Sequence, residues 1–154
     1  MKVIFIEVDG VLQNHRTQYI QKTGKREVDE VAVSLINNVV RETGAKLVFA
    51  IKQRDIETNL KSIIEEYGFN LTDVHDDQLA PYYSIPSRER AIDQWIRTHT
   101  NVTHAISIST VPAYHELCKV VVASAFNGFT YGNYLECIGI LSDDPNAPPE
   151  LYKR

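Results

Sequence analysis

The chain has few cysteines and no long hydrophobic run. Its two cysteines, Cys118 and Cys137, lack the CxxC spacing of metal and redox sites. We therefore predict two reduced, packed thiols rather than a disulfide framework. No segment reaches the roughly 20 apolar residues of a membrane span, which argues against a membrane partner. Glu7 and Asp9 interrupt the apolar N-terminal run, so we expect no signal peptide and a cytoplasmic location.

Positive charge is also scarce. The 16 lysines and arginines are outnumbered by 20 aspartates and glutamates, which gives a net charge of −4 and a pI near 5.7. Proteins that bind duplex nucleic acid in bulk usually carry a basic surface, so the composition argues against that function. It still permits one local anion site. The length and the hydrophobic content of 44% fit one domain with a sizeable core.

Apolar runs alternate with segments of helical spacing along the chain. We predict buried strands at 2–8, 46–51, 69–74, 105–108 and 119–123. We predict helices at 28–43, 55–67, 86–98 and 131–141. Residues 13–27 are polar and predict a loop or small hairpin, and the three prolines within 142–154 predict an irregular C-terminal tail. The alternation predicts an α/β domain over residues 1–141 with a mostly parallel central sheet.

Five short motifs follow one another in this frame. They are Glu7-Val8-Asp9-Gly10-Val11, the strand before Lys52-Gln53-Arg54, the helix with Arg88, Arg90 and Trp95, the strand ending Ser107-Ile108-Ser109, and Asn127-Gly128-Phe129-Thr130. By the order and spacing of these motifs the chain resembles the haloacid dehalogenase-like proteins. It is most similar to the small domains grouped with RNA-repair and nucleic-acid-processing proteins. The resemblance implies a three-layer, Rossmann-like fold with a minimal cap.

The resemblance implies a phosphoryl-transfer site, yet several of its residues are changed. In the family, a first aspartate attacks phosphorus and a second, two residues on, is the general acid and base. Here Glu7 replaces the first aspartate, and its extra methylene moves the carboxylate by ~1.5 Å. A misplacement of a reacting group by ~1 Å can lower the rate of catalysis ~100-fold. Asp9 keeps the second position. The family's fourth motif supplies a carboxylate for Mg²⁺, whereas Ser107, Ile108 and Ser109 supply none.

The candidate catalytic residues are therefore Glu7 and Asp9, in a degenerate motif. We expect no metal and no cofactor, except for Mg²⁺ if phosphatase activity survives. The candidate ligand-binding residues are basic or hydroxyl side chains near the expected pocket: Lys52, Arg54, Arg88, Arg90, Ser107 and Ser109. Arginine forks bind phosphate well. Lys52 stands where the family has a serine, and we expect it to pair with Glu7 or Asp9 in the volume of the metal.

Several alternatives remain open for single residues. Tyr82 and Tyr83, on the predicted loop before Arg88, are candidates for stacking on a base, although packing is the commoner role of a tyrosine. Asp9 either takes part in ligand binding or accepts hydrogen bonds from the backbone of its own turn. The stretch His75-Asp76-Asp77 fits a polar loop better than a metal site.

Three functions are compatible with these residues. The first is a degenerate haloacid dehalogenase-like protein that binds a small phosphorylated ligand or nucleotide without hydrolysing it, as a sensor, sponge or regulator. The second is a weak Mg²⁺-dependent phosphatase that uses Glu7 and Asp9. The third is an interaction protein, or a homo-oligomer, with a vestigial pocket. Tyr131, Tyr134 and Tyr152, near the C-terminal helix, would then contribute to its surface.

Overall fold

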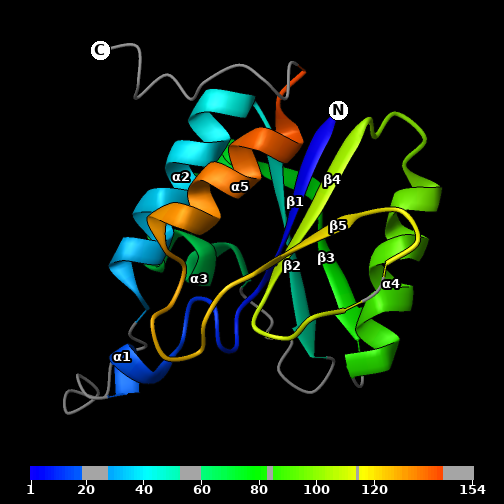
Figure 1. Cartoon of the computed structure of the whole chain (residues 1–154). Helices are drawn as coiled ribbons and strands as arrows, with labels where there is room; N and C mark the ends of the chain where they lie inside the picture. Colours follow the sequence, from blue (N-terminus) through cyan, green and yellow to red (C-terminus); the bar gives the residue numbers. More distant parts are fainter. Residues whose placement is uncertain (19–27, 53–59, 83–84, 114, 144–154) are drawn as a thin grey trace.

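The computed structural model describes residues 1–18, 28–52, 60–82, 85–113 and 115–143 (Figure 1). The strands are β1 (Lys2–Glu7), β2 (Lys46–Lys52), β3 (Val74–Tyr82), β4 (His104–Ser109) and β5 (Lys119–Val122). The helices are α1 (His15–Gln18), α2 (Glu30–Thr43), α3 (Leu60–Glu66), α4 (Ile85–Thr98) and α5 (Tyr131–Leu141), with a 3₁₀ turn at Leu71–Asp73. Within these ranges, none of the helices has the length and apolar character needed to cross a bilayer.

The strands form one sheet in the order β3-β2-β1-β4-β5, and each neighbouring pair is parallel. Helices α2 and α5 lie against one face, and α4 lies against the other (Figure 1). This confirms the predicted three-layer α/β fold with a parallel central sheet. The predicted minimal cap depends partly on residues 19–27, which lie outside the described ranges.

Alternation along β1 decides which way its last side chain points. Ile4 and Ile6 belong to the apolar cluster under α2 and α5, whereas Val3 and Phe5 belong to the cluster under α4. Successive strand residues face opposite sides of the sheet. Glu7 shares the parity of Val3 and Phe5, so it faces α4.

The buried Asp29 begins helix α2. Its carboxylate accepts hydrogen bonds from the backbone N–H groups of Val31 and Ala32, and from the side-chain amide of Asn14 at 2.7 Å. Gly44 ends the helix in a left-handed conformation, with φ at +68°, which glycine adopts at little cost. The cap therefore fixes the helix and also ties it to the segment that follows β1.

The third strand is the main error of the sequence-based prediction. Residues 69–74 were expected to be a strand, but Leu71–Asp73 is a 3₁₀ turn whose N-cap is Asn70. The strand begins at Val74 instead, so His75-Asp76-Asp77 lies in β3 and not in a polar loop. β3 is an edge strand of the sheet, and an edge strand tolerates polar residues that a central strand would have to bury. Its sequence therefore lacks a continuous apolar run.

Smaller differences occur at element ends. The expected loop at 13–27 contains one helical turn, α1, while its remainder at 19–27 lies outside the described residues. The helix expected at 55–67 is seen as α3, and 53–59 also lie outside. The helix at 131–141 has the predicted bounds. Of the predicted C-terminal tail, only Ser142 and Asp143 are described. Cys118 and Cys137 are free thiols, and burial raises the pKa of Cys118 to about 12.

Replacement of Asp29 tests the cap of α2. Asp29→Ala removes the side-chain acceptor of two backbone N–H groups and the shorter of the hydrogen bonds given for the Asn14 amide, so we expect the free energy of unfolding to fall by about 2 kcal/mol. Urea denaturation monitored by circular dichroism measures this loss. Glu30→Ala, at the exposed next position, is the control and should cost less than about 1 kcal/mol. Equal losses for the two variants would contradict the assigned cap.

Candidate functional site

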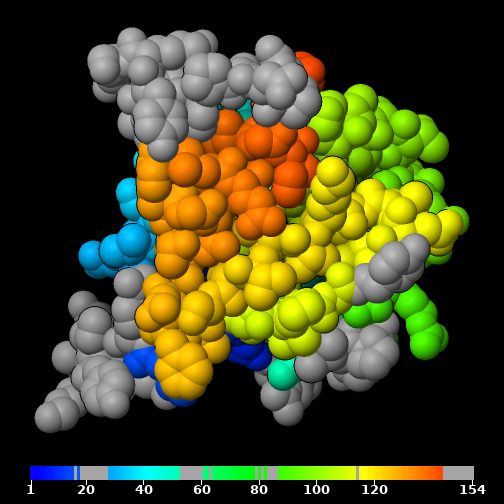
Figure 2. All heavy atoms as spheres, viewed as in Figure 1, coloured from blue at the N-terminus to red at the C-terminus, as the bar shows by residue number. Residues whose placement is uncertain are grey.

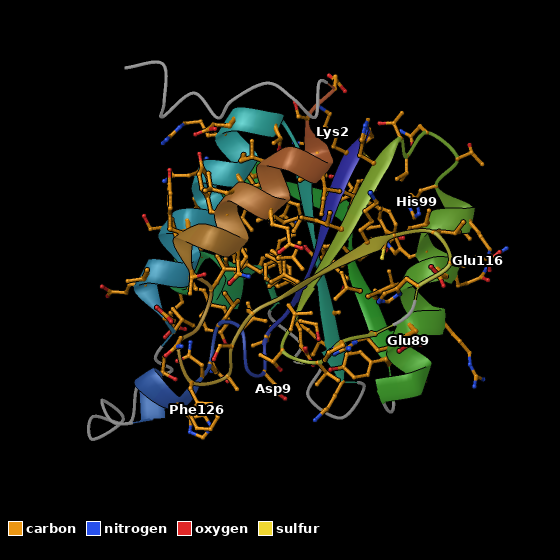
Figure 3. The ribbon with its side chains drawn as sticks, in the orientation of Figure 1. Lys2, Asp9, Glu89, His99, Glu116 and Phe126 are labelled. Carbon is orange, nitrogen blue, oxygen red and sulfur yellow. The ribbon has the colours of Figure 1, made fainter. Side chains whose placement is uncertain are left out.

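The carboxyl ends of three adjacent strands bring the predicted site residues together. Glu7 ends β1, Lys52 ends β2 and Ser109 ends β4, while Asp9 follows in the turn after β1. Figure 3 shows Asp9 at this end of the sheet, beyond the ribbon of β1. Parallel strands gather their carboxyl ends at one edge, which is why sequence positions so far apart become neighbours.

Both carboxylate oxygens of Glu7 are engaged. Oε1 lies 2.6 Å from Nη1 of Arg88, and it accepts a long hydrogen bond of 3.5 Å from the hydroxyl of Tyr82. Oε2 accepts a hydrogen bond of 2.8 Å from the hydroxyl of Ser109. Glu7 is itself buried. The carboxylate is therefore held by three side chains, from α4, β3 and β4.

Arg88 is the largest fully buried side chain of the described residues, with 0% exposure. Its guanidinium forms the ion pair with Glu7 and lies 5.9 Å from the centre of the Tyr82 ring. Glu7 engages Nη1 at 2.6 Å, whereas Nε and Nη2 make no hydrogen bond of ordinary geometry to a described residue. A buried donor without an acceptor is costly, by about 1–3 kcal/mol. Among the described residues, the guanidinium thus has more donors than acceptors.

A second ion pair lies closer to solvent. Nζ of Lys52 is 3.7 Å from Oδ2 of Asp9, and the two side chains are 32% and 55% exposed. The predicted pairing of Lys52 with a motif carboxylate is therefore confirmed for Asp9. No described backbone amide donates to the Asp9 carboxylate, and the amide of Gly10 donates instead to the carbonyl of Gln13. Of the two interpretations of Asp9, the one that confines it to its own turn receives no support from these contacts.

Glycine is required at position 10 both by the backbone conformation there and by the nearby side chain of Thr110. The φ of Gly10 is +89°, and a Cβ at this position would lie 2.8 Å from the hydroxyl oxygen of Thr110. Any other residue would be strained in this conformation and would clash with the segment after β4. The close approach holds the turn that carries Asp9 against the end of β4.

A cavity of about 340 Å³ opens beside this turn. It is lined by Asp9, Gly10, Gln13, Asn14, His15, Thr17 and Ala125. The backbone N–H of His15 donates to the carbonyl of Ala125 at 3.0 Å, which joins the turn after β1 to the loop after β5. The His15 ring stacks on the ring of Phe126, with 4.5 Å between centres and 7° between planes. The cavity therefore has an acidic wall at Asp9 and an aromatic rim.

The structure separates the other candidates. Arg90 lies on the exposed side of α4, two residues from Arg88 and so about 200° away around the helix. Ser107 is buried in β4 and makes no hydrogen bond to Glu7, whereas Ser109 does. Arg54 and Tyr83 lie outside the described residues. In the described ranges, no group of three or more histidine, cysteine or acidic side chains is placed to hold a metal.

Three contributors to the site were assigned wrongly or missed. Tyr82 is not on a loop where it can stack on a base; it ends β3, is buried, and directs its hydroxyl at Glu7. This position, beside Glu7 and Asp9 in the interior, raises its pKa to about 12, mainly through burial. His15 and Phe126 were not singled out, because neither lies in a motif and only the tertiary contact makes them a pair.

One buried histidine lies next to Arg88. His115, in the loop between β4 and β5, is 7% exposed and lies against the backbone of Glu89 in α4. Burial lowers its pKa from 6.5, and the nearby Asp93 and Glu89 only partly oppose this, while Arg88 reinforces it. Asp93 also accepts hydrogen bonds from the two backbone amides that follow His115, at 3.1 Å each. His115 is therefore held neutral against α4.

Replacement of Arg88 tests the buried ion pair. Arg88→Met should lower the free energy of unfolding by about 3–5 kcal/mol, because it leaves the Glu7 carboxylate buried and unpaired. The double variant Glu7→Leu with Arg88→Met should recover much of this loss. Arg90→Met is the matched control and should change stability by less than about 0.5 kcal/mol. Urea denaturation that gave additive losses in the double variant would show that the pair is not coupled.

The lowered pKa of His115 predicts a pH dependence. Above pH 6.5 the histidine is neutral in both states, and its contribution to stability is fully present. As the pH falls below this value the unfolded chain takes up the proton first, so stability is lost as the pH approaches the lowered pKa of the folded state. We expect the difference in melting temperature between wild type and His115→Gln to shrink from about pH 7.5 to about pH 5. A constant difference would contradict the assignment.

Comparison with known proteins agrees with this architecture. The family model described as the HAD domain in Swiss Army Knife RNA repair proteins matches residues 3–132, which include β1, the Arg88 helix, β4 and the turn before α5. No curated protein and no solved structure matches the chain significantly. HAD stands for haloacid dehalogenase-like, the family to which the motifs pointed. With its opening strand, turn and α/β sheet inside the matched range, this chain belongs to the family of HAD domains in Swiss Army Knife RNA repair proteins.

Proposed function

We propose that this domain binds the phosphoryl group of a nucleotide at the carboxyl end of β1 and does not hydrolyse it. The observation that carries the proposal is the state of Glu7. A nucleophile needs a free oxygen directed at the substrate, whereas the Glu7 oxygens are held by Arg88 and Tyr82 on one side and by Ser109 on the other. The residue that would attack phosphorus is thus bound into the protein interior.

The donor set also fits Mg²⁺ poorly. The ion prefers hard oxygen ligands, usually one or two carboxylates, in octahedral geometry. Glu7 is paired with Arg88, and Asp9 is paired with Lys52, so two acidic side chains are already balanced by two basic ones. β4 contributes the hydroxyls of Ser107 and Ser109 but no carboxylate. Binding Mg²⁺ would add two positive charges to a cluster whose acidic and basic side chains already balance. We therefore assign no catalytic step to the metal.

The same cluster has groups that suit a phosphate oxygen. Lys52 is a partly exposed cation beside Asp9, and the buried Arg88, paired with Glu7, has further donors that no described residue engages. Ligand oxygens that reach Arg88 would supply the acceptors that the described residues do not, and charge-assisted hydrogen bonds of this kind are among the stronger ones. The family description names RNA repair, which makes a nucleotide or an RNA end the expected carrier of the phosphate.

The two alternatives differ from this proposal in measurable ways. A weak phosphatase would need Asp9 as an acid or base, and the Asp9 side chain is indeed accessible. An interaction protein with a vestigial pocket would bind no phosphate compound. Only one of the two described tyrosines that favoured such a surface is exposed. Tyr131 is exposed, whereas Tyr134 is buried and its hydroxyl donates to Glu42 at 2.7 Å. Tyr152 lies outside the described residues.

Asp9→Asn separates binding from turnover. If the site only binds, the substitution frees Lys52 from its ion pair. It also removes a negative charge whose repulsion of the phosphate is worth about 1 kcal/mol at ~4 Å in water. We expect adenosine 5′-monophosphate to bind about fivefold more tightly, as measured by calorimetry in EDTA. If the domain is a phosphatase, the wild type will instead release phosphate with Mg²⁺ and the variant will not.

Two pairs of matched variants locate the anion. Lys52→Met should weaken the binding of the monophosphate, whereas Lys61→Met, on the exposed side of α3, should leave it unchanged. Arg88→Met should also abolish binding if it folds, and Arg90→Met should not. The Lys52 pair keeps the test valid if Arg88→Met proves unstable. Equal binding by all four variants would place the phosphate elsewhere, and absence of binding by the wild type would leave the vestigial-pocket interpretation.

A further inference from the structure

The loop after β5 presents an aromatic ring beside the cavity at Asp9. Phe126 is 70% exposed, the largest exposure among the large apolar side chains described as exposed. One of its faces is covered by the parallel ring of His15, which itself lines the cavity. Figure 3 shows Phe126 and Asp9 at the same end of the molecule, and the loop that contains Phe126, gold in Figure 2, protrudes there.

This aromatic pair is held in place by its backbone. The hydroxyl of Ser124 accepts hydrogen bonds from the amides of Phe126 and Asn127, at 3.1 and 3.0 Å. Ser124 and Gly128 exchange two backbone hydrogen bonds across the loop, and His15 donates to the carbonyl of Ala125. The ring is therefore positioned before any ligand arrives, which lowers the entropic cost of stacking on it.

The cavity next to the pair has polar groups suited to a base edge. The carboxamide of Gln13 and the carboxylate of Asp9 line it. Among the described residues, the Gln13 side chain makes no hydrogen bond and the Asp9 carboxylate is paired with Lys52. Asn14 and Thr17, by contrast, use their side chains within the protein. An exposed phenylalanine alone is common on protein surfaces. A fixed, stacked ring beside a polar cavity and a phosphate site is a more specific arrangement.

We propose that Phe126, backed by His15, is a stacking platform for the nucleobase of the bound ligand. The ligand class is then a nucleotide or the end of a single strand, and not a sugar phosphate or inorganic phosphate. The proposal rests on the function proposed above, because it adds a base site to that phosphate site. Base stacking on an aromatic side chain is tolerant of base identity, so the platform alone selects for the presence of a base and not for one base.

Ligand affinities of the wild type and three variants test the platform. The probes are adenosine 5′-monophosphate, ribose 5-phosphate and adenosine, measured by calorimetry or, for weak binding, by saturation-transfer NMR. Phe126→Ala should weaken binding of the monophosphate by about 5- to 150-fold, from the usual strength of base stacking. It should leave ribose 5-phosphate unchanged. Phe126→Trp should retain the affinity, and Tyr131→Ala, which removes an exposed aromatic side chain that does not line the cavity, is the control.

Each outcome separates the two proposals. If the wild type binds ribose 5-phosphate as tightly as the monophosphate, the platform is wrong and the phosphate site stands. If adenosine transfers saturation from the wild type but not from Phe126→Ala, and no phosphate compound binds better than adenosine, the platform stands and the phosphate site is wrong. If no probe binds, both are wrong, and Phe126 is better regarded as a contact for another macromolecule.

Discussion

The ion pair between Glu7 and Arg88 is the contact around which the rest of the site is arranged. A carboxylate at the end of a central strand and a guanidinium at the start of α4 are both removed from water. Such a pair is tolerated only where further hydrogen bonds compensate the lost hydration. Ser109 and Tyr82 supply those bonds to the carboxylate, whereas the guanidinium keeps unused donors. Among the described residues, the guanidinium is thus the less fully matched partner of the pair.

The parallel sheet makes this arrangement possible. β1 lies at the centre with β2 and β4 on either side, so three chain segments end next to one another. The side-chain parity of β1 then directs Glu7 toward the α4 layer. Lys52 and Asp9, which lie in β2 and after β1, form a second and partly exposed pair of opposite charges. A basic side chain therefore lies beside each of the two motif carboxylates.

The fold was largely predictable, because its central strands are continuous apolar runs and its helices carry apolar residues at helical spacing. The site was predictable where it depends on strand ends, as for Glu7 and Ser109. The choice between Arg88 and Arg90 was also available in the sequence. Arg88, Ile92 and Trp95 are spaced i, i+4 and i+7, so Arg88 shares the buried face of α4. The edge strand β3 was not predictable from apolar runs. Because Tyr82 lies at the end of this strand, its position was not predictable either. The stacking of His15 on Phe126 depends on a contact between distant loops that no local pattern records.

Asn14 links the cavity to the start of α2. Its side-chain amide donates to the Asp29 carboxylate, and the same carboxylate closes the first turn of the helix. A molecule in the cavity that competes for this amide would also change how firmly the helix end is held. The turn after β1 and the first turn of α2 therefore share one buried carboxylate, so that a change at Asn14 alters a hydrogen bond at both.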